Sequence, residues 1–143
     1  MIKPFEFFIK EGLVRKSSGN ISMAKSFLEK AQIRVKRIDP KTIEENEASI
    51  VFEDIYESLR EAAQALMEVK GYKPYSHEAV ISFVKEHKYL SDEKTNIFDN
   101  YRILRNNLVY KAEKVSIQKC LEALEFTKQT LPEIDKQFNS MIS

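Results

Sequence analysis

Hydrophobic residues recur along this chain at intervals of three and four positions, and strand-like alternation is nearly absent. This spacing is the signature of amphipathic helices. The pattern predicts a first helix over about residues 4–15 and a second over about residues 21–38. The polar stretch Ser17-Ser18-Gly19-Asn20 separates them, because such residues typically interrupt helices.

A third, longer helix is predicted from Asp39-Pro40 to about residue 70. Asp39 offers a cap and Pro40 a first helical residue, and Gly71 ends the segment. At about 100° per residue, the apolar positions of this segment fall within a narrow arc. They are Val51, Ile55, Leu59, Ala62, Leu66 and Val69. We therefore expect this face to lie in the core.

Serine residues mark the starts of the remaining helices. GYKPYS is predicted as a turn, with Ser76 capping a short fourth helix that ends near His87. Ser91 is expected to cap a fifth helix through about residue 110, with acidic residues at the positive end of its dipole. Ser116 is expected to cap the sixth, which Pro132 should bend or restart.

These elements define the predicted fold class. The chain contains no linker long enough to separate two domains and no internal repeat. We therefore expect one domain over residues 1–143, an all-α, antiparallel up-and-down bundle of about five to six helices.

Composition narrows the function classes. The chain has 143 residues, and its 23 Lys and Arg residues nearly balance 22 Asp and Glu residues, for a net charge of +1. This argues against a protein that binds nucleic acid over its whole surface, and leaves a local basic patch open. The single cysteine, Cys120, excludes an internal disulfide and any zinc site with paired cysteines, and we predict a buried structural thiol.

Targeting and cofactor signals are missing from the sequence. Glu6, Lys10 and Glu11 interrupt the N-terminal apolar patch, unlike the core of a signal peptide, and no run approaches the roughly 20 apolar residues of a membrane helix. We expect a soluble cytoplasmic protein without membrane contact. There is no glycine-rich phosphate loop and no zinc-type histidine pair, so we expect neither a cofactor nor a metal site.

The predicted fifth helix contains an unusual arginine. Arg105 lies about 60° from the centre of the apolar stripe of this helix, so its charge needs a partner. Asp54 or Glu47 on the third helix would serve in a purely structural reading. Asn106 and Tyr110 point to nearly the opposite side. We expect Arg105 and Tyr110 to meet only if the helix loosens, or if a second chain packs against it.

The segment RNNLVY, which follows YESLREAAQALMEVKGYKPYSHEAV, resembles the HEPN superfamily (higher eukaryotes and prokaryotes nucleotide-binding domain) over about residues 45–130. The superfamily motif consists of Arg, a polar residue that is often Asn, a short spacer and usually His. Arg105 and Asn106 match its first two positions, and Tyr110 stands where the histidine would be.

The resemblance implies a helical bundle, usually homodimeric, with the motif helices at a shared cleft. Many members of the superfamily resemble metal-independent ribonucleases, including toxins paired with a nucleotidyltransferase-fold antitoxin, and others bind nucleotides or RNA without catalysis. The first hypothesis is therefore an RNA- or nucleotide-binding module of the toxin-antitoxin kind with such a partner. The alternatives are an active metal-independent ribonuclease toxin that uses Arg105, and a non-catalytic structural or adaptor dimer.

Metal-free RNA cleavage needs a base, an acid and a cation for the phosphorane charge. Arg105 can supply the cation, but a tyrosine with a pKa of about 10 is only about one part in a thousand ionised at pH 7. Tyr110 is thus a poor base. The candidate catalytic residues are Arg105, Asn106 and Tyr110, and the candidate RNA-binding residues are Arg102, Arg105, Asp54 and Lys111.

The two histidines, His77 and His87, are ten residues apart, which is no metal-ligand spacing within one helix. His77 falls in the first turn of the predicted fourth helix, where the positive end of the helix dipole lowers its proton affinity. We predict surface or capping roles for both.

Overall fold

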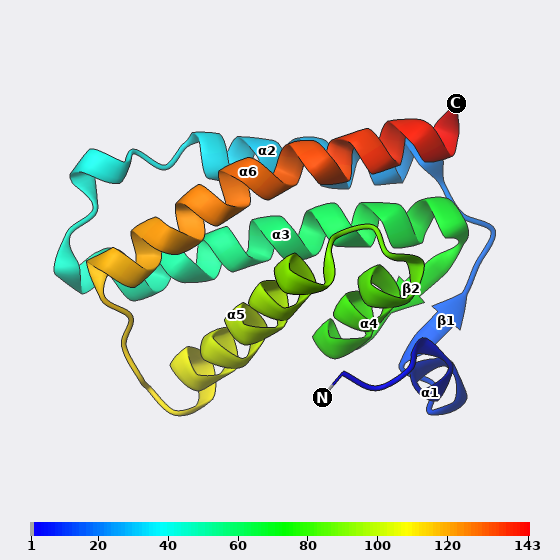
Figure 1. Ribbon diagram of the computed structural model, residues 1–143, viewed down its shortest axis with the longest axis horizontal. Helices are drawn as coiled ribbons and strands as arrows, with labels where there is room; N and C mark the ends of the chain where they lie inside the picture. The colour runs from blue at the N-terminus through cyan, green and yellow to red at the C-terminus, as the bar shows by residue number, and fades with distance from the viewer. Residues whose placement is uncertain (1) are drawn as a thin grey trace.

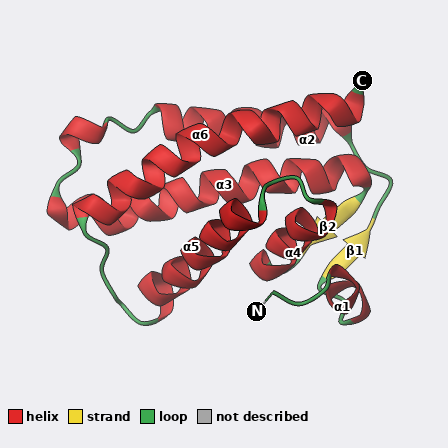
Figure 2. Cartoon of the chain, viewed as in Figure 1, coloured by secondary structure: helices red, strands yellow, loops and turns green. Residues whose placement is uncertain are grey.

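The computed structural model describes residues 2–143, which form six α-helices and one pair of strands (Figure 1). The elements are α1 (Phe5–Lys10), β1 (Val14–Lys16), α2 (Ile21–Lys36), the 3-10 turns η1 (Pro40–Thr42) and η2 (Glu45–Glu47), α3 (Ala48–Lys70), β2 (Tyr72–Pro74), α4 (His77–His87), α5 (Asp92–Tyr110) and α6 (Ile117–Ile142). The predicted all-α helical bundle is confirmed, with the small strand pair as its one addition within residues 2–143 (Figure 2).

Helix α3 is the centre of the bundle. Helices α2 and α6 pack on one side of it, and α4 and α5 pack on the other (Figure 1). The predicted apolar stripe is buried at Ile55, Leu59, Ala62 and Leu66, and it is half-buried at its two ends. Because α3 has neighbours on both sides, residues outside the stripe such as Tyr56 are buried as well.

The first helix is shorter than predicted. Helix α1 ends at Lys10, and Gly12 then adopts a φ of 74°, which turns the chain away from a helical path. The chain continues as β1, which pairs antiparallel with β2 from Val14 opposite Pro74 to Lys16 opposite Tyr72. The predicted turn GYKPYS thus contains a strand. Both strands have only three residues, too few to produce a visible alternation in the sequence.

The third helix starts later than predicted, at Ala48. The Asp39 side chain accepts a hydrogen bond from the Lys41 amide at 2.9 Å, but the helical turn that it caps is the short η1. The predicted end is confirmed, since Gly71 follows the helix with a φ of 82°. Helix α6 runs through Pro132 without restarting.

The predicted serine caps are confirmed. The side chains of Ser76, Ser91 and Ser116 accept hydrogen bonds from backbone amides three residues later, at 3.4, 3.2 and 3.1 Å. Cys120 is fully buried, as predicted, and burial raises the pKa of its thiol to about 11.

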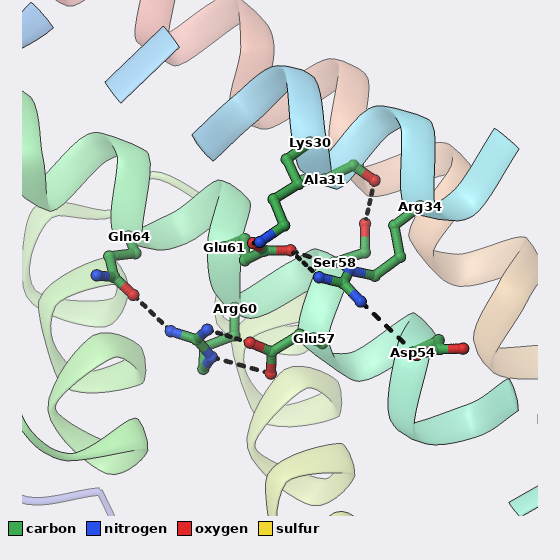
Figure 3. A network of polar contacts seen from close by, with 9 residues as sticks. All are labelled: Lys30, Ala31, Arg34, Asp54, Glu57, Ser58, Arg60, Glu61 and Gln64. Atoms are coloured by element: carbon green, nitrogen blue, oxygen red, sulfur yellow. Dashed lines mark hydrogen bonds and ion pairs between the residues drawn. The ribbon is translucent and has the colours of Figure 1, made fainter. Parts of the chain in front are cut away.

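A polar network fixes α2 against α3 (Figure 3). The carboxylate of the buried Glu61 accepts a hydrogen bond from the Nε of Arg34 at 3.0 Å, and it lies 3.4 Å from the Nζ of Lys30. The hydroxyl of Ser58 donates to the carbonyl of Ala31 at 2.6 Å. These contacts satisfy the polar groups that α3 places in an otherwise apolar interface.

Candidate functional site

A groove of about 280 Å³ lies between the start of α4 and the second half of α5. Four of its lining residues are site candidates that the sequence identified on α5. The other three come from the start of α4. The lining residues are Ser76, His77, Glu78, Arg102, Arg105, Asn106 and Tyr110. We call this the arginine groove.

Local helical geometry explains how the arginine groove forms. Ser76 caps α4, so His77 and Glu78 are its first two residues and lie at its exposed end. On α5, Arg102, Arg105 and Asn106 are three and four positions apart, a spacing that places side chains on one side of a helix. Arg105 and Tyr110 both line this groove while α5 stays helical through Tyr110, so sharing the groove requires neither a loosened helix nor a second chain.

Arg102 connects the two helices of the groove. Its Nε donates to Oδ1 of Asp99 at 2.8 Å, and its Nη2 lies 3.6 Å from Oε1 of Glu78 on α4. Two carboxylates therefore surround this largely buried guanidinium. Arg102, a candidate RNA-binding residue in the sequence, lines the groove, but its Nε and Nη2 contact carboxylates of the protein, and the contact with Glu78 links α5 to α4.

Arg105 has a different environment. Its Nη1 donates to Oδ1 of Asn106 at 3.4 Å, and among residues 2–143 no carboxylate oxygen lies within 4.0 Å of its guanidinium. The structural reading that paired Arg105 with Asp54 or Glu47 is wrong, since Asp54 lies 3.7 Å from Arg34 instead. Arg105 is thus a half-buried cation at the edge of a groove, without an ion-pair partner within 4.0 Å among residues 2–143.

His77 is the site residue that sequence reasoning missed. It is half-buried in the arginine groove, its ring stacks on Tyr56 at a centroid distance of 5.7 Å, and its Nδ1 lies 3.1 Å from the Tyr56 hydroxyl. Burial, followed by the charges of Arg60 and Arg105, lowers the pKa of His77 below its usual value. The imidazole is therefore neutral at pH 7. Its place after the cap Ser76 was visible in the sequence, but its contact with α3 was not.

Three predicted residues differ in how far they belong to the groove. Tyr110 lies at the rim, with 76% of its surface exposed. Lys111, the exposed residue that follows α5, does not line the groove. Asp54 was expected beside Arg105, as its partner or as an RNA-binding residue, but its side chain points to Arg34 on the α2 side of α3 and does not line the groove (Figure 3). This expectation is wrong because α3 has neighbours on opposite sides.

The groove offers three chemical capabilities. Arg105 can bind a phosphate through two parallel N–H donors, the Tyr110 hydroxyl can donate a hydrogen bond, and neutral His77 can accept a proton.

Within residues 2–143, no group of three or more His, Cys, Asp or Glu side chains is arranged to hold a metal ion. No helix in the same range has the length and apolar character needed to cross a membrane. Comparisons with protein-family models, curated proteins and solved structures found no match to this chain.

Proposed function

We propose that this protein is a HEPN-like RNA- or nucleotide-binding module in which Arg105 binds a phosphate group. The observation that carries the proposal is the half-buried guanidinium of Arg105, which lacks a carboxylate partner among residues 2–143. A half-buried charge without a partner is costly, and a ligand phosphate would compensate it. The planar guanidinium also matches phosphate geometry better than a lysine would.

The neighbours of Arg105 support this function. The exposed ring of Tyr110 lines the same groove and can stack on a nucleobase, as aromatic side chains do in proteins that bind single-stranded nucleic acid. The near-neutral net charge of the chain suits a local phosphate site rather than a basic surface.

The proposal includes the partners that the family resemblance implies. The protein forms a homodimer in the cytoplasm, works in a toxin-antitoxin pair, and binds a nucleotidyltransferase-fold protein. Light scattering over a range of protein concentrations tests the dimer, and a mass that stays at one chain at every concentration contradicts it.

Binding to a fluorescein-labelled single-stranded RNA, followed by anisotropy, tests the phosphate role of Arg105. We expect the Arg105→Ala protein to bind about tenfold or more weakly, because a charge-assisted bidentate contact is lost. Arg105→Lys should recover part of the affinity, since lysine keeps the positive charge but lacks the two parallel N–H donors of the guanidinium. Arg37→Ala, at an exposed arginine after α2, is the matched control and should bind like the wild type. Equal affinities of wild type and Arg105→Ala would refute the proposal.

A second candidate function is metal-independent RNA cleavage, and the position of His77 favours it. The sequence motif lacks a histidine at Tyr110, but α4 supplies one to the same groove. If Nδ1 of His77 donates to the Tyr56 hydroxyl, its Nε2 is free to accept a proton. The lowered pKa keeps the ring in this neutral, accepting form at pH 7.

The cleavage step follows from these roles. His77 takes the proton of a ribose 2′-hydroxyl, whose oxygen attacks the adjacent phosphorus while the bond to the 5′-oxygen breaks. The products are a 2′,3′-cyclic phosphate and a 5′-hydroxyl, which receives its proton from the Tyr110 hydroxyl. Arg105 stabilises the negative charge that develops on the phosphorane.

Incubation of a mixed RNA pool in EDTA tests this candidate in wild type, Arg105→Ala, His77→Asn and Tyr110→His proteins. Cleavage by the wild type that disappears in both Arg105→Ala and His77→Asn supports the roles given above. Cleavage that persists in His77→Asn excludes His77 as the base. Cleavage that occurs only in Tyr110→His indicates a binding groove that lacks an effective acid-base group, and leaves the binding function as the sole proposal.

A further inference from the structure

A second groove adjoins the arginine groove at Ser76 and His77, which line both. Its volume is about 480 Å³, and it extends from these two residues toward α3 and α2. Its lining includes Tyr75, Gln64, Arg60 and Lys30. A ligand that occupies the arginine groove can therefore continue across His77 into this neighbouring space, which we call the tyrosine groove.

The charges in the tyrosine groove are compensated within the protein. Both oxygens of the Glu57 carboxylate accept hydrogen bonds from the Arg60 guanidinium, one of them from Nε at 3.1 Å (Figure 3). Lys30 lies 3.4 Å from the buried carboxylate of Glu61. Each cation thus has an acidic partner, unlike Arg105. A groove with paired charges attracts a phosphate less than the arginine groove does, and it suits an uncharged group.

Gln64, which lines this groove, carries side-chain donors that no other group uses among residues 2–143. Its side-chain oxygen accepts a hydrogen bond from Nη1 of Arg60, which fixes the orientation of the amide (Figure 3). The Nε2 group, with its two N–H donors, has no hydrogen-bond partner among residues 2–143 and belongs to a residue that lines the groove. Such donors match the carbonyl oxygens of a nucleobase.

Tyr75 provides a flat apolar ring on a restrained stretch of backbone. Its surface is 60% exposed, although it follows directly after the strand pair. The Tyr75 amide donates to the carbonyl of Leu13 at 2.8 Å, which extends the ladder between β1 and β2 by one bond. An exposed aromatic ring on a restrained backbone is well suited to stack on a base, because little conformational freedom is lost on binding.

We propose that the tyrosine groove binds a nucleobase of a single-stranded RNA whose phosphate is bound by Arg105. The base stacks on Tyr75, the amide of Gln64 donates to a base carbonyl, and the RNA backbone crosses the surface at His77. This inference rests on the proposed function, since it adds a base subsite beside the phosphate site.

The test compares two labelled probes, hexauridylate and an abasic hexamer with the same ribose-phosphate backbone but no bases. The wild type should bind hexauridylate at least about fivefold more tightly, because stacking of a single base on an aromatic ring already accounts for such a ratio. Tyr75→Ala should lower this ratio several-fold and leave the affinity for the abasic probe unchanged. Tyr75→Phe keeps the ring and should retain the ratio. Arg105→Ala should weaken both probes together.

Gln64→Glu provides an independent variant, because it keeps an oxygen for Arg60 and removes the two amide donors. It should also lower the ratio between the probes. The base subsite is refuted if Tyr75→Ala retains the wild-type ratio, or if the wild type binds both probes equally. In those cases the phosphate site at Arg105 still stands. Failure of the wild type to bind either probe refutes the proposed function and the base subsite together. Circular dichroism of each variant confirms that it is folded.

Discussion

Replacing Gly71 with alanine should destabilise the protein by about 3 kcal/mol. Gly71 ends α3 and leads into β2, and its φ of 82° lies in the left-handed region. A methyl group on this residue would approach the carbonyl oxygen of Ser17 more closely than 3.0 Å, a separation that real Cβ atoms essentially never show. The obstacle is backbone, so it cannot move aside by changing a rotamer.

Three contributions make up the expected loss. The left-handed conformation costs an alanine about 1–2 kcal/mol. Relief of the clash must displace Ser17, whose amide donates to the Gly71 carbonyl at 2.6 Å, and a lost hydrogen bond together with disturbed packing costs about 2 kcal/mol. The lower entropy of the unfolded alanine variant offsets about 0.4–1 kcal/mol.

Gly12→Ala is the matched control. Gly12 has a similar φ of 74°, but a methyl group on it would meet no atom within 4 Å. Only the conformational cost remains, and the expected loss is about 1 kcal/mol. The difference between the two variants, about 2 kcal/mol, therefore isolates the close approach of the Gly71 and Ser17 backbones.

Urea unfolding followed by far-UV circular dichroism measures both variants, since the chain has no tryptophan for fluorescence. The reasoning is refuted if Gly71→Ala and Gly12→Ala lose the same stability. Because Tyr75 follows β2, Gly71→Ala should also lower the preference for hexauridylate over the abasic probe, while Gly12→Ala should affect it less.

Three further predictions concern buried groups. The pKa of His77 is lower in the folded protein than in the unfolded chain, so the unfolded chain binds more protons below about pH 6.5 and stability falls as the pH falls. A plot of Tm against pH should therefore be flatter for His77→Asn than for the wild type, and parallel plots would contradict this. Glu61→Gln should lose about 1–2 kcal/mol in urea unfolding, since Lys30 and Arg34 lose their charged partner, and an unchanged midpoint would argue against it. Cys120 should react with a thiol reagent only after unfolding, because it is buried and its pKa is raised; rapid reaction of the folded protein would show otherwise.

The parts of the fold that depend on local signals could be predicted from the sequence. Ser76, Ser91 and Ser116 cap their helices as expected, because a capping hydrogen bond forms between residues only three apart. The pairing of β1 with β2 could not be predicted, since it joins residues 14–16 to residues 72–74 through backbone groups that every sequence possesses. The later start of α3 likewise depends on how η1 and η2 pack rather than on Pro40 alone.

In the site, too, the features set by local helical spacing could be predicted and those set by helix packing could not. Helical spacing on α5 predicted that Arg105 would lie at the edge of the apolar face, and the structure places it half-buried there. The choice of its neighbour could not be predicted, because it depends on which helix packs beside α5. The sequence suggested Asp54 on α3, whereas α4 supplies His77 and Glu78. Periodicity identifies the buried face of a helix but not the residue that faces it.

Arg105 differs from the other partly buried arginines in having no carboxylate partner among residues 2–143. Four arginines are at least partly buried, and three of them, Arg34, Arg60 and Arg102, have a carboxylate within 4.0 Å, whereas Arg105 has none among residues 2–143. A fold that neutralises its other partly buried guanidinium groups with acidic side chains leaves this charge open at a groove. An arginine kept only for stability would gain from an acidic neighbour, since a partly buried cation is costly without one. An arginine that serves to bind a phosphate would lose affinity with such a neighbour, because the two anions would compete.

Placing an acid beside Arg105, as in Asn106→Asp, should therefore raise the stability of the folded protein while weakening its binding of RNA. If stability and binding rise together, Arg105 does not bind phosphate.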